Sequence, residues 1–353
     1  MSIPTVNDLA ATARSTRWEL VARPSGWPTP DDVRRVTVDL PELADGEIRV
    51  VNEAVSVDPY MRGRMNEGPS YVPGFVLGEP MDGAAVGVVV ASRAQQLPVG
   101  TRVLHGQGWR DVAQLPADGA QQLPDLQGPD GPLPPSTFLG IAGMTGFTAW
   151  LGLLRIARMR EGDTVFVSGA AGTVGSAVGQ IARLKGAARV IGSAGGAEKN
   201  RIVTERYGFD ACLDYQQGDV AGQLVEAAPD GIDVYFDNVG GDHLEAAIQC
   251  LNADGRAALC GAISQYNDTE PPAGPRNMGL LVTKRLRLQG FIQSFHTEAM
   301  PEFLTEMGGW LANGEITGDE TVEDGIEQAF DAFLGMMQGR NVGKMVVRTA
   351  VAD

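Results

Sequence analysis

The sequence is poor in cysteine, the residue that builds disulfide frameworks and most structural zinc sites. It has three cysteines in 353 residues, and none of them belongs to a Cys-x-x-Cys pair. They are Cys212, Cys250 and Cys260. A small, odd number of separated cysteines argues against a disulfide-stabilised secreted fold and is typical of a reducing compartment.

Histidine is equally scarce, which limits metal binding. The three histidines, His105, His243 and His296, lie far apart and follow no ligand spacing. A catalytic zinc site needs several Cys, His or carboxylate ligands around one ion, and a structural site often needs four cysteines. The sequence therefore predicts no metal site, and any chemistry has to proceed without a Lewis acid.

Basic residues are fewer than acidic ones. Lys and Arg number 28 against 44 Asp and Glu, a formal net charge of −16. This balance argues against the basic surface that binds nucleic acid or an anionic membrane. No apolar run approaches the ~20 residues of a membrane span, and Met1–Arg23 lacks a signal-peptide pattern. We expect a cytoplasmic protein whose partners include neither nucleic acid nor a membrane.

The chain up to about residue 135 favours β-structure, because Val and Ile partly alternate and Pro and Gly clusters interrupt them. The candidate strands are Trp18–Val21, Arg34–Val38, Glu47–Ser56, Val86–Ala91 and Thr101–His105. Val86–Val90 followed by Pro98–Leu104 suggests a small closed barrel. Pro116–Pro135, rich in Pro, Gly, Asp and Gln, predicts a loop or a domain connection.

From Met144 onward, strand and helix patterns alternate. The predicted strands are Thr164–Ser168, Arg189–Gly192, Ala211–Asp214, Asp233–Phe236, Arg256–Ala262 and Leu286–Ile292. The predicted helices are Thr145–Arg158, Val174–Lys185, Glu198–Tyr207, Val220–Ala227 and His243–Leu251. Such alternation is typical of an α/β fold with a doubly wound parallel sheet covered by helices on both faces.

After about residue 296 this alternation ends. Met300–Asn313 and Val322–Gln338 predict amphipathic helices, and Lys344–Arg348 predicts a strand. We expect this part to return to the first domain. The predicted domains are residues 1–135 with 297–353, for substrate binding and catalysis, and residues 136–296, for nucleotide binding.

One segment, Val165–Ser176, reads as a buried strand, a glycine turn and the start of a helix. Gly169, Gly172 and Gly175 leave no Cβ in the way of a close approach. Such a turn brings backbone N–H groups and a helix N-terminus up to a pyrophosphate. The preceding strand and the following helix make this pattern a dinucleotide-binding fingerprint.

The next strand indicates which dinucleotide is bound. In NAD-binding domains a carboxylate near the tip of the second strand accepts hydrogen bonds from the ribose hydroxyls. Here the tip reads Val190-Ile-Gly-Ser-Ala-Gly-Gly196, without a carboxylate, and Lys199 follows on the first helical turn. A lysine ammonium can pair with a 2′-phosphate. The segment favours NADP over NAD, although without the glycine turn Lys199 would be read as a solvated helix lysine.

Several segments, in order, resemble one family. They are Val57–Arg64, Gly143–Trp150, Gly169–Gln180, Gly195–Lys199, Tyr235–Gly241, Cys260–Asn267 and Gly339–Lys344. Over nearly its whole length the chain resembles the zinc-independent leukotriene B4 dehydrogenase / prostaglandin reductase family of medium-chain dehydrogenases/reductases, which includes plant alkenal double-bond reductases and bacterial curcumin reductase. The resemblance implies a Rossmann domain, a GroES-like β-barrel catalytic domain, and NADPH-dependent reduction of the C=C bond of α,β-unsaturated ketones and aldehydes.

The resemblance also implies which residues contact NADPH. The pyrophosphate would lie against Gly172, Thr173, Val174, Gly175 and Ser176. Lys199 and Tyr215 would hold the 2′-phosphate. The nicotinamide half would contact Asn238, Cys260, Ile263, Ser264, Tyr266, Phe291, Ile292, Gln293 and Asn341.

Without a metal, a positioned O–H group is the natural means of stabilising the substrate oxygen and delivering a proton. Tyr266 is the leading candidate for this catalytic role, because it follows a strand's C-terminal end, where ligands bind in such sheets. Solvent or the cofactor's ribose hydroxyl are alternative proton sources. Tyr60 and Tyr71, from the first domain, are predicted to line the pocket.

Two other functions remain open at this stage. One is quinone reduction or metal-free alcohol oxidation, and the other is NADPH binding without turnover. The expected substrate is a small apolar enone or enal. An exposed sheet edge near Leu286–Ile292 would also let two copies pair as a homodimer.

Overall fold

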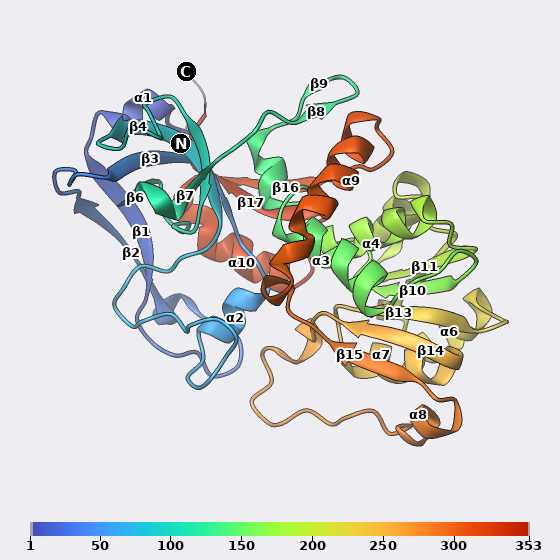
Figure 1. The fold of residues 1–353 in the computed structure, drawn as a ribbon. Helices are drawn as coiled ribbons and strands as arrows, with labels where there is room; N and C mark the ends of the chain where they lie inside the picture. The colour runs from blue at the N-terminus through green and yellow to red at the C-terminus, as the bar shows by residue number, and fades with distance from the viewer. Residues whose placement is uncertain (1–2, 352–353) are drawn as a thin grey trace.

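A computed structural model describes residues 3–351, and its C-terminal half is built on one parallel sheet (Figure 1). The sheet has six strands in the order β12-β11-β10-β13-β14-β15. The strands are β10 (Thr164–Ser168), β11 (Arg189–Ala194), β12 (Ala211–Asp214), β13 (Ile232–Asp237), β14 (Leu251–Leu259) and β15 (Arg287–Gly290). After β10 the chain adds β11 and β12 on one side and then β13, β14 and β15 on the other side of β10. The predicted doubly wound Rossmann fold is therefore confirmed.

Both faces of this sheet are buried, which explains the nearly continuous apolar runs of its strands. On β10, Val165 and Val167 belong to one core cluster and Phe166 to another. The first cluster lies under α3 (Met144–Leu151), α4 (Thr173–Leu184) and α9 (Met300–Ala312). The second lies under α6 (Val220–Ala227) and α7 (Gly241–Cys250).

The N-terminal half is built mainly on antiparallel strands. A seven-stranded sheet has the order β16-β17-β3-β4-β5-β7, with β6 also paired to β3. Its strands are β3 (Glu47–Ser56), β4 (Ala85–Ser92), β5 (Arg102–His105), β6 (Val112–Pro116), β7 (Ala120–Gln122), β16 (Glu320–Asp324) and β17 (Lys344–Arg348). A separate pair joins β1 (Arg14–Leu20) to β2 (Val33–Asp39). The predicted combination of a β-rich domain with a Rossmann domain is confirmed.

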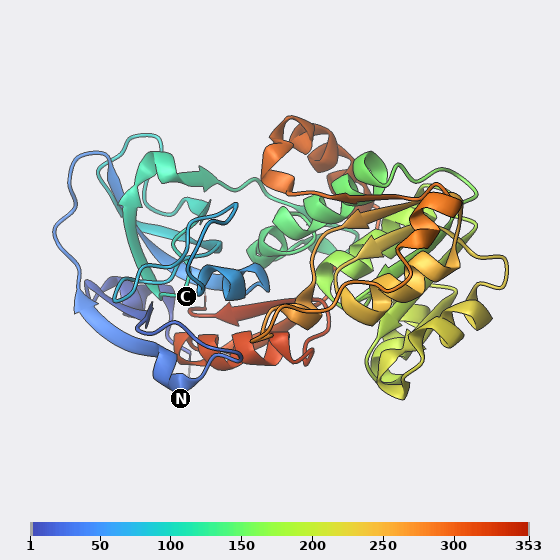
Figure 2. The same cartoon turned by 90° about the horizontal axis from the view of Figure 1, so that it is seen from below.

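The chain ends by returning to its beginning. Strand β17 pairs antiparallel with β3, with Val346 opposite Ser56, and α10 (Ala329–Met337) packs in the core cluster that contains Met61 and Trp109. Figures 1 and 2 show α10 and β17, in red, among the blue N-terminal elements. Helix α9 instead packs against α3, where the ring centroids of Phe303 and Phe147 lie 5.4 Å apart. The domain boundaries at residues 135 and 297 stay a prediction.

Three local predictions are wrong. Val322–Gln338 is not one helix: its first residues belong to β16, and Gly325, with φ +96°, separates this strand from α10. Pro116–Pro135 is not a plain loop, because it contains β7 and the hairpin of β8 (Gln127–Gly128) and β9 (Gly131–Pro132). Leu251 begins β14 rather than ending a helix. Strands β16 and β7 form by pairing with distant segments, which leaves little local signal; the β8–β9 hairpin is local but has only two residues in each strand.

The remaining helices are short. They are α1 (Val6–Ala10), α2 (Tyr60–Arg64), α5 (Ala197–Arg201) and α8 (Gly279–Thr283). Across residues 3–351, none of the helices has the length and apolar character needed to cross a membrane.

Candidate cofactor and substrate site

The glycine turn links β10 to α4 and leaves space for a bulky anion. Gly169 has φ +63°, a left-handed conformation that favours glycine. A Cβ on Gly175 would collide with the carbonyl oxygen of Gly169, whereas one on Gly172 would meet only that oxygen, at 3.5 Å. The turn is thus tightly packed at Gly175 and open at Gly172. The first-turn N–H groups of α4, Thr173 to Gly175, have no intrahelical acceptors, so the segment fits a pyrophosphate.

This turn is fastened to the segment that precedes β17. The N–H of Gly343 donates to the carbonyl of Ala171 at 2.8 Å, and Gly172 and Gly343 form a parallel bridge. Gly343 itself has φ +64°. The predicted pyrophosphate position therefore lies where the parallel-sheet half meets the C-terminal return of the chain.

A buried carboxylate organises the neighbouring turn after β13. Asp237 accepts from the Tyr235 hydroxyl at 2.7 Å and from the N–H of Gly240 at 2.8 Å. Asn238 follows, and its Nδ2 donates to the carbonyl of Ser168 at 2.7 Å, just before the glycine turn. Sequence reasoning selected Asn238 and missed Asp237. The signal was available, since Asp237 directly follows the run Val234–Phe236 and precedes Asn-Val-Gly-Gly.

Lys199 and Tyr215 lie together beyond the tip of β11. The Lys199 ammonium donates to the carbonyl of Asn341 at 2.7 Å and to that of Gly339, and burial lowers its pKa. A Cβ on Gly195 would lie 2.8 Å from the Tyr215 hydroxyl. Because Lys199 is held by backbone carbonyls, it is not a freely solvated lysine. A cation, a hydroxyl donor and a side-chain-free glycine fit a 2′-phosphate.

His243 was assigned only to a helix start, yet it belongs to this corner of the site. Its Nε2 lies 2.8 Å from the Ser193 hydroxyl, at the tip of β11. Its ring lies 5.7 Å from that of Tyr215, edge to face, and burial lowers the His243 pKa. The tip residue that would be a carboxylate in an NAD site is therefore a serine bonded to a neutral imidazole.

A cavity of about 830 Å³ opens at the carboxyl ends of β13, β14 and β15. Four of the predicted site residues line it: Cys260, Tyr266, Phe291 and Ile292. Ile263 and Ser264 form the adjoining turn η7 (Ile263–Gln265), where the Ser264 hydroxyl donates to the carbonyl of Val239 at 2.6 Å. Gln293 follows directly after Ile292. The cavity stands where ligands bind in open α/β sheets.

Tyr266 presents a protonated hydroxyl to this cavity. Its oxygen accepts a hydrogen bond from the N–H of Ala262 at 3.3 Å, and burial raises its pKa. Burial also raises the pKa of the neighbouring Cys260 to about 12, so this thiol stays protonated. The arrangement can donate a hydrogen bond or a proton to a bound oxygen.

Tyr60 and Tyr71 are not among the residues that line this cavity. Tyr71 is half exposed; partial burial, followed by the neighbouring Tyr266 and Cys260, raises its pKa to about 12. Burial, and then the Asp58 carboxylate, raises the pKa of Tyr60. Tyr60 and Tyr266 pack against the same core cluster. The structure thus gathers these tyrosines near one another, and their contacts with substrate stay a prediction.

In residues 3–351, no group of three or more His, Cys, Asp or Glu side chains is placed to hold a metal ion. The histidines in particular are dispersed. His105 is buried in the N-terminal sheet beside Asn52, whereas His296 lines the cavity.

Comparison with known proteins gives two family matches and several full-length relatives. Residues 16–123 match the family described as the N-terminal domain of oxidoreductase, and residues 173–308 match zinc-binding dehydrogenase. The NADPH-dependent curcumin reductase of Escherichia coli (strain K12) is 43% identical, covering 96% of this chain and 98% of the relative. Prostaglandin reductase 1 of Mus musculus is 40% identical, covering 94% and 98%.

A solved structure shows the same similarity over the full chain. CurA from Vibrio vulnificus in complex with NADPH superposes with a TM-score of 0.88 at 44% identity, covering 96% of this chain and 100% of that one. Identity above 40% over almost the full length of such relatives is decisive for the family. This chain belongs to the zinc-independent medium-chain dehydrogenase/reductase family that contains the curcumin and prostaglandin reductases.

Proposed function

We propose that this protein is an NADPH-dependent reductase of the C=C bond in α,β-unsaturated ketones and aldehydes. The observation that carries the proposal is Tyr266, a protonated hydroxyl that lines a cavity beside the predicted nicotinamide residues. The relatives support it, since one is named a curcumin reductase and another a prostaglandin reductase. Curcumin is itself an α,β-unsaturated ketone.

The cofactor would be held along the carboxyl edge of the parallel sheet. The glycine turn would bind its pyrophosphate, and Lys199 and Tyr215 would bind its 2′-phosphate. The turn after β13, with Asn238, would lie beside the nicotinamide half. When bound, NADPH supplies the hydride that adds to the β-carbon of the substrate.

The side chains of the site would handle the charge that this addition creates. Negative charge develops on the carbonyl oxygen as the β-carbon is reduced, and a hydroxyl donor stabilises it. Tyr266 would donate to that oxygen, and the α-carbon then takes a proton to give the saturated ketone or aldehyde. Tyr60 and Tyr71 would enclose the apolar part of the substrate. Cys260, kept as a thiol, is a poor nucleophile toward the electrophilic substrate.

One assay tests the proposal. NADPH oxidation is followed with a panel of enones, quinones and saturated alcohols, with each product identified by mass spectrometry. We expect enones to yield saturated ketones. A hydroquinone as the main product, oxidation of an alcohol, or NADPH binding without turnover would each replace the proposal with one of the alternatives.

The proposal extends to location and assembly. NADPH use and three unpaired cysteines suit the cytoplasm. In the described sheet β15 pairs with β14 alone, and its Arg287, Gln289 and Gly290 are exposed. An unpaired edge of this kind supports a homodimer formed by pairing β15 with its symmetry mate. Sedimentation at micromolar concentration should show about twice 37.3 kDa; only the single-chain mass would refute the dimer.

A further inference from the structure

The short helix α2 carries Tyr60 and two arginines that are almost completely buried. Arg62 is 2% exposed and Arg64 is 7% exposed. Arginine is seldom buried to this degree unless each N–H finds a partner. The partners of these two guanidinium groups include residues of the two loops that carry the other predicted pocket tyrosines, Tyr266 and Tyr71.

Arg62 reaches the loop of Tyr266. Its Nε donates to Asn267 Oδ1 at 2.9 Å, one residue beyond Tyr266. Its other nitrogens donate to the carbonyl of Gly26 at 2.7 Å and to Asn66 Oδ1 at 2.6 Å. These acceptors are amide and carbonyl oxygens, so the bonds hold loops in place rather than neutralise the charge. Through this hydrogen bond to Asn267, Arg62 of the N-terminal half holds the segment that follows β14.

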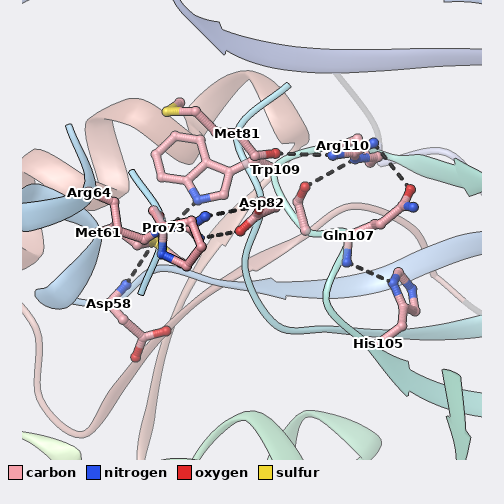
Figure 3. A network of polar contacts seen from close by, with 11 residues as sticks. Asp58, Met61, Arg64, Pro73, Met81, Asp82, His105, Gln107, Trp109 and Arg110 are labelled. Carbon is pink, nitrogen blue, oxygen red and sulfur yellow. Dashed lines mark hydrogen bonds and ion pairs between the residues drawn. The ribbon is translucent and has the colours of Figure 1, made fainter. Parts of the chain in front are cut away.

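Arg64 reaches the loop of Tyr71. Its Nε donates to the carbonyl of Pro73 at 2.8 Å, and its guanidinium lies 4.1 Å above the ring of Phe75. The N–H of Phe75 donates back to the Arg64 carbonyl at 2.8 Å. On its other side Arg64 forms an ion pair with Asp82, as Figure 3 shows. The loop from residue 66 to 78, which contains Tyr71, is therefore fastened just beyond that tyrosine.

We propose that α2 is the common anchor of the substrate pocket, in which Arg62 positions Tyr266 and Arg64 positions Tyr71 around Tyr60. This inference rests on the proposed function for the roles of the tyrosines. Both anchors depend on the planar guanidinium group of arginine. In Arg62 its N–H groups point at several fixed acceptors, and in Arg64 its flat face also lies on an aromatic ring. Lysine keeps the charge but offers neither.

The two anchors have separate consequences. Tyr266 acts on the substrate oxygen, so loosening its loop lowers kcat. Tyr71 encloses the substrate, so loosening its loop raises the KM for the enone. The KM for NADPH should not change when the Tyr71 loop is loosened, because the predicted cofactor contacts lie on other segments. Loosening the Tyr266 loop should raise it, because Ile263, Ser264 and Tyr266 are predicted to contact the nicotinamide half.

The experiment compares Arg62→Lys and Arg64→Lys with Arg35→Met, a control on an exposed arginine of β2. Asn267→Ala removes the Arg62 contact from the loop side and guards against a misfolded Arg62 variant. Hydrogen exchange of all variants is measured by mass spectrometry, and kcat and both KM values are measured with NADPH and an enone. Arg62→Lys is also combined with Tyr266→Phe.

We expect faster exchange in residues 263–270 for Arg62→Lys and Asn267→Ala, and in residues 67–78 for Arg64→Lys; Asn66 is left out because Arg62 also donates to its side chain. We expect kcat to fall ~10-fold or more for Arg62→Lys, because a small misplacement of a reacting group has effects of this order. This loss should disappear, to within about 2-fold, in the Tyr266→Phe background. Unchanged exchange in both segments, or exchange raised equally across the chain, would overturn the inference. If Tyr266→Phe alone keeps full kcat, the catalytic role of Tyr266 fails, and the exchange data still decide the anchoring.

Discussion

The ammonium of Lys344 lies 2.6 Å from the carboxylate of Asp58, and each side chain is only 4% exposed. Lys344 begins β17, near the end of the chain, and Asp58 stands two residues before Tyr60. Lys344 also donates to the carbonyl of Val57 at 3.0 Å. The buried pair thus joins the returning strand to the segment that leads into α2.

Removing only the cation should be costly. Lys344→Met leaves the Asp58 carboxylate buried and unpaired, so we expect a loss of about 3–5 kcal/mol in the free energy of unfolding. Urea denaturation measures it. Combining the change with Asp58→Asn removes the stranded charge and should restore a large part of the stability. A loss below about 1 kcal/mol in the single variant would contradict a buried, water-excluded pair.

Lys199 should control the choice of cofactor. Lys199→Gln removes a charged hydrogen-bond donor worth about 1.5–3 kcal/mol, so we expect the KM for NADPH to rise roughly 10- to 100-fold. The KM for NADH, which has no 2′-phosphate, should change little. Since burial lowers the Lys199 pKa, the wild-type KM for NADPH should rise with pH before the ordinary lysine value of about 10.4 is reached. Equal effects on both cofactors would place Lys199 outside the 2′-phosphate site.

Tyr266 should be required in its protonated form. Burial raises its pKa above the ordinary value of about 10, so the hydroxyl keeps its proton across the neutral range. We expect kcat for an enone to stay level from about pH 6 to 9 and to fall only at higher pH. Tyr266→Phe should lower kcat by ~10²-fold or more at all these pH values. A variant with unchanged kcat would assign the proton to solvent or to the cofactor's ribose.

We expect that position 343 does not tolerate a residue with a side chain. It has φ +64°, and a Cβ would collide with the backbone oxygen of Asp319. Gly343→Ala should therefore destabilise the protein by about 1–3 kcal/mol. It should also weaken NADPH binding, because Gly343 braces the glycine turn. The matched control is Gly309→Ala in α9, where nothing lies within 4 Å of the new Cβ; it should stabilise by about 0.5–1 kcal/mol. Equal thermal unfolding of the two variants would contradict this account.

Strong local patterns made most of the fold predictable. The apolar strands and the glycine ends of the helices placed β10 to β13 and α4 to within a few residues. What failed was structure that depends on distant partners. Strand β16 forms because Val322 lies beside Val346 of β17, and its own sequence, ending in charged residues, resembles the start of a helix.

The candidate site divides in the same way. The glycine turn and Lys199 were visible because their chemistry is carried by neighbouring residues. The contributions of Gly339 and Gly343 were not, since they act through backbone atoms brought in by the last strand. His243 and Arg62 were missed for a related reason. His243 matters through Ser193, 50 positions away, and Arg62 matters through Asn267, 205 positions away.

The return of β17 to β3 also sets an order of events during synthesis. All strands of the parallel sheet precede residue 291, so that half of the molecule can assemble before the last strand leaves the ribosome. The half that is translated first is completed last, because the end of β3 from Ala54 to Ser56 pairs on one side only with residues 346–348. Until then this end of β3 exposes an unpaired edge, the feature that invites pairing between chains. A nascent or truncated chain that stops before Lys344 should therefore depend on chaperones far more than the finished protein does.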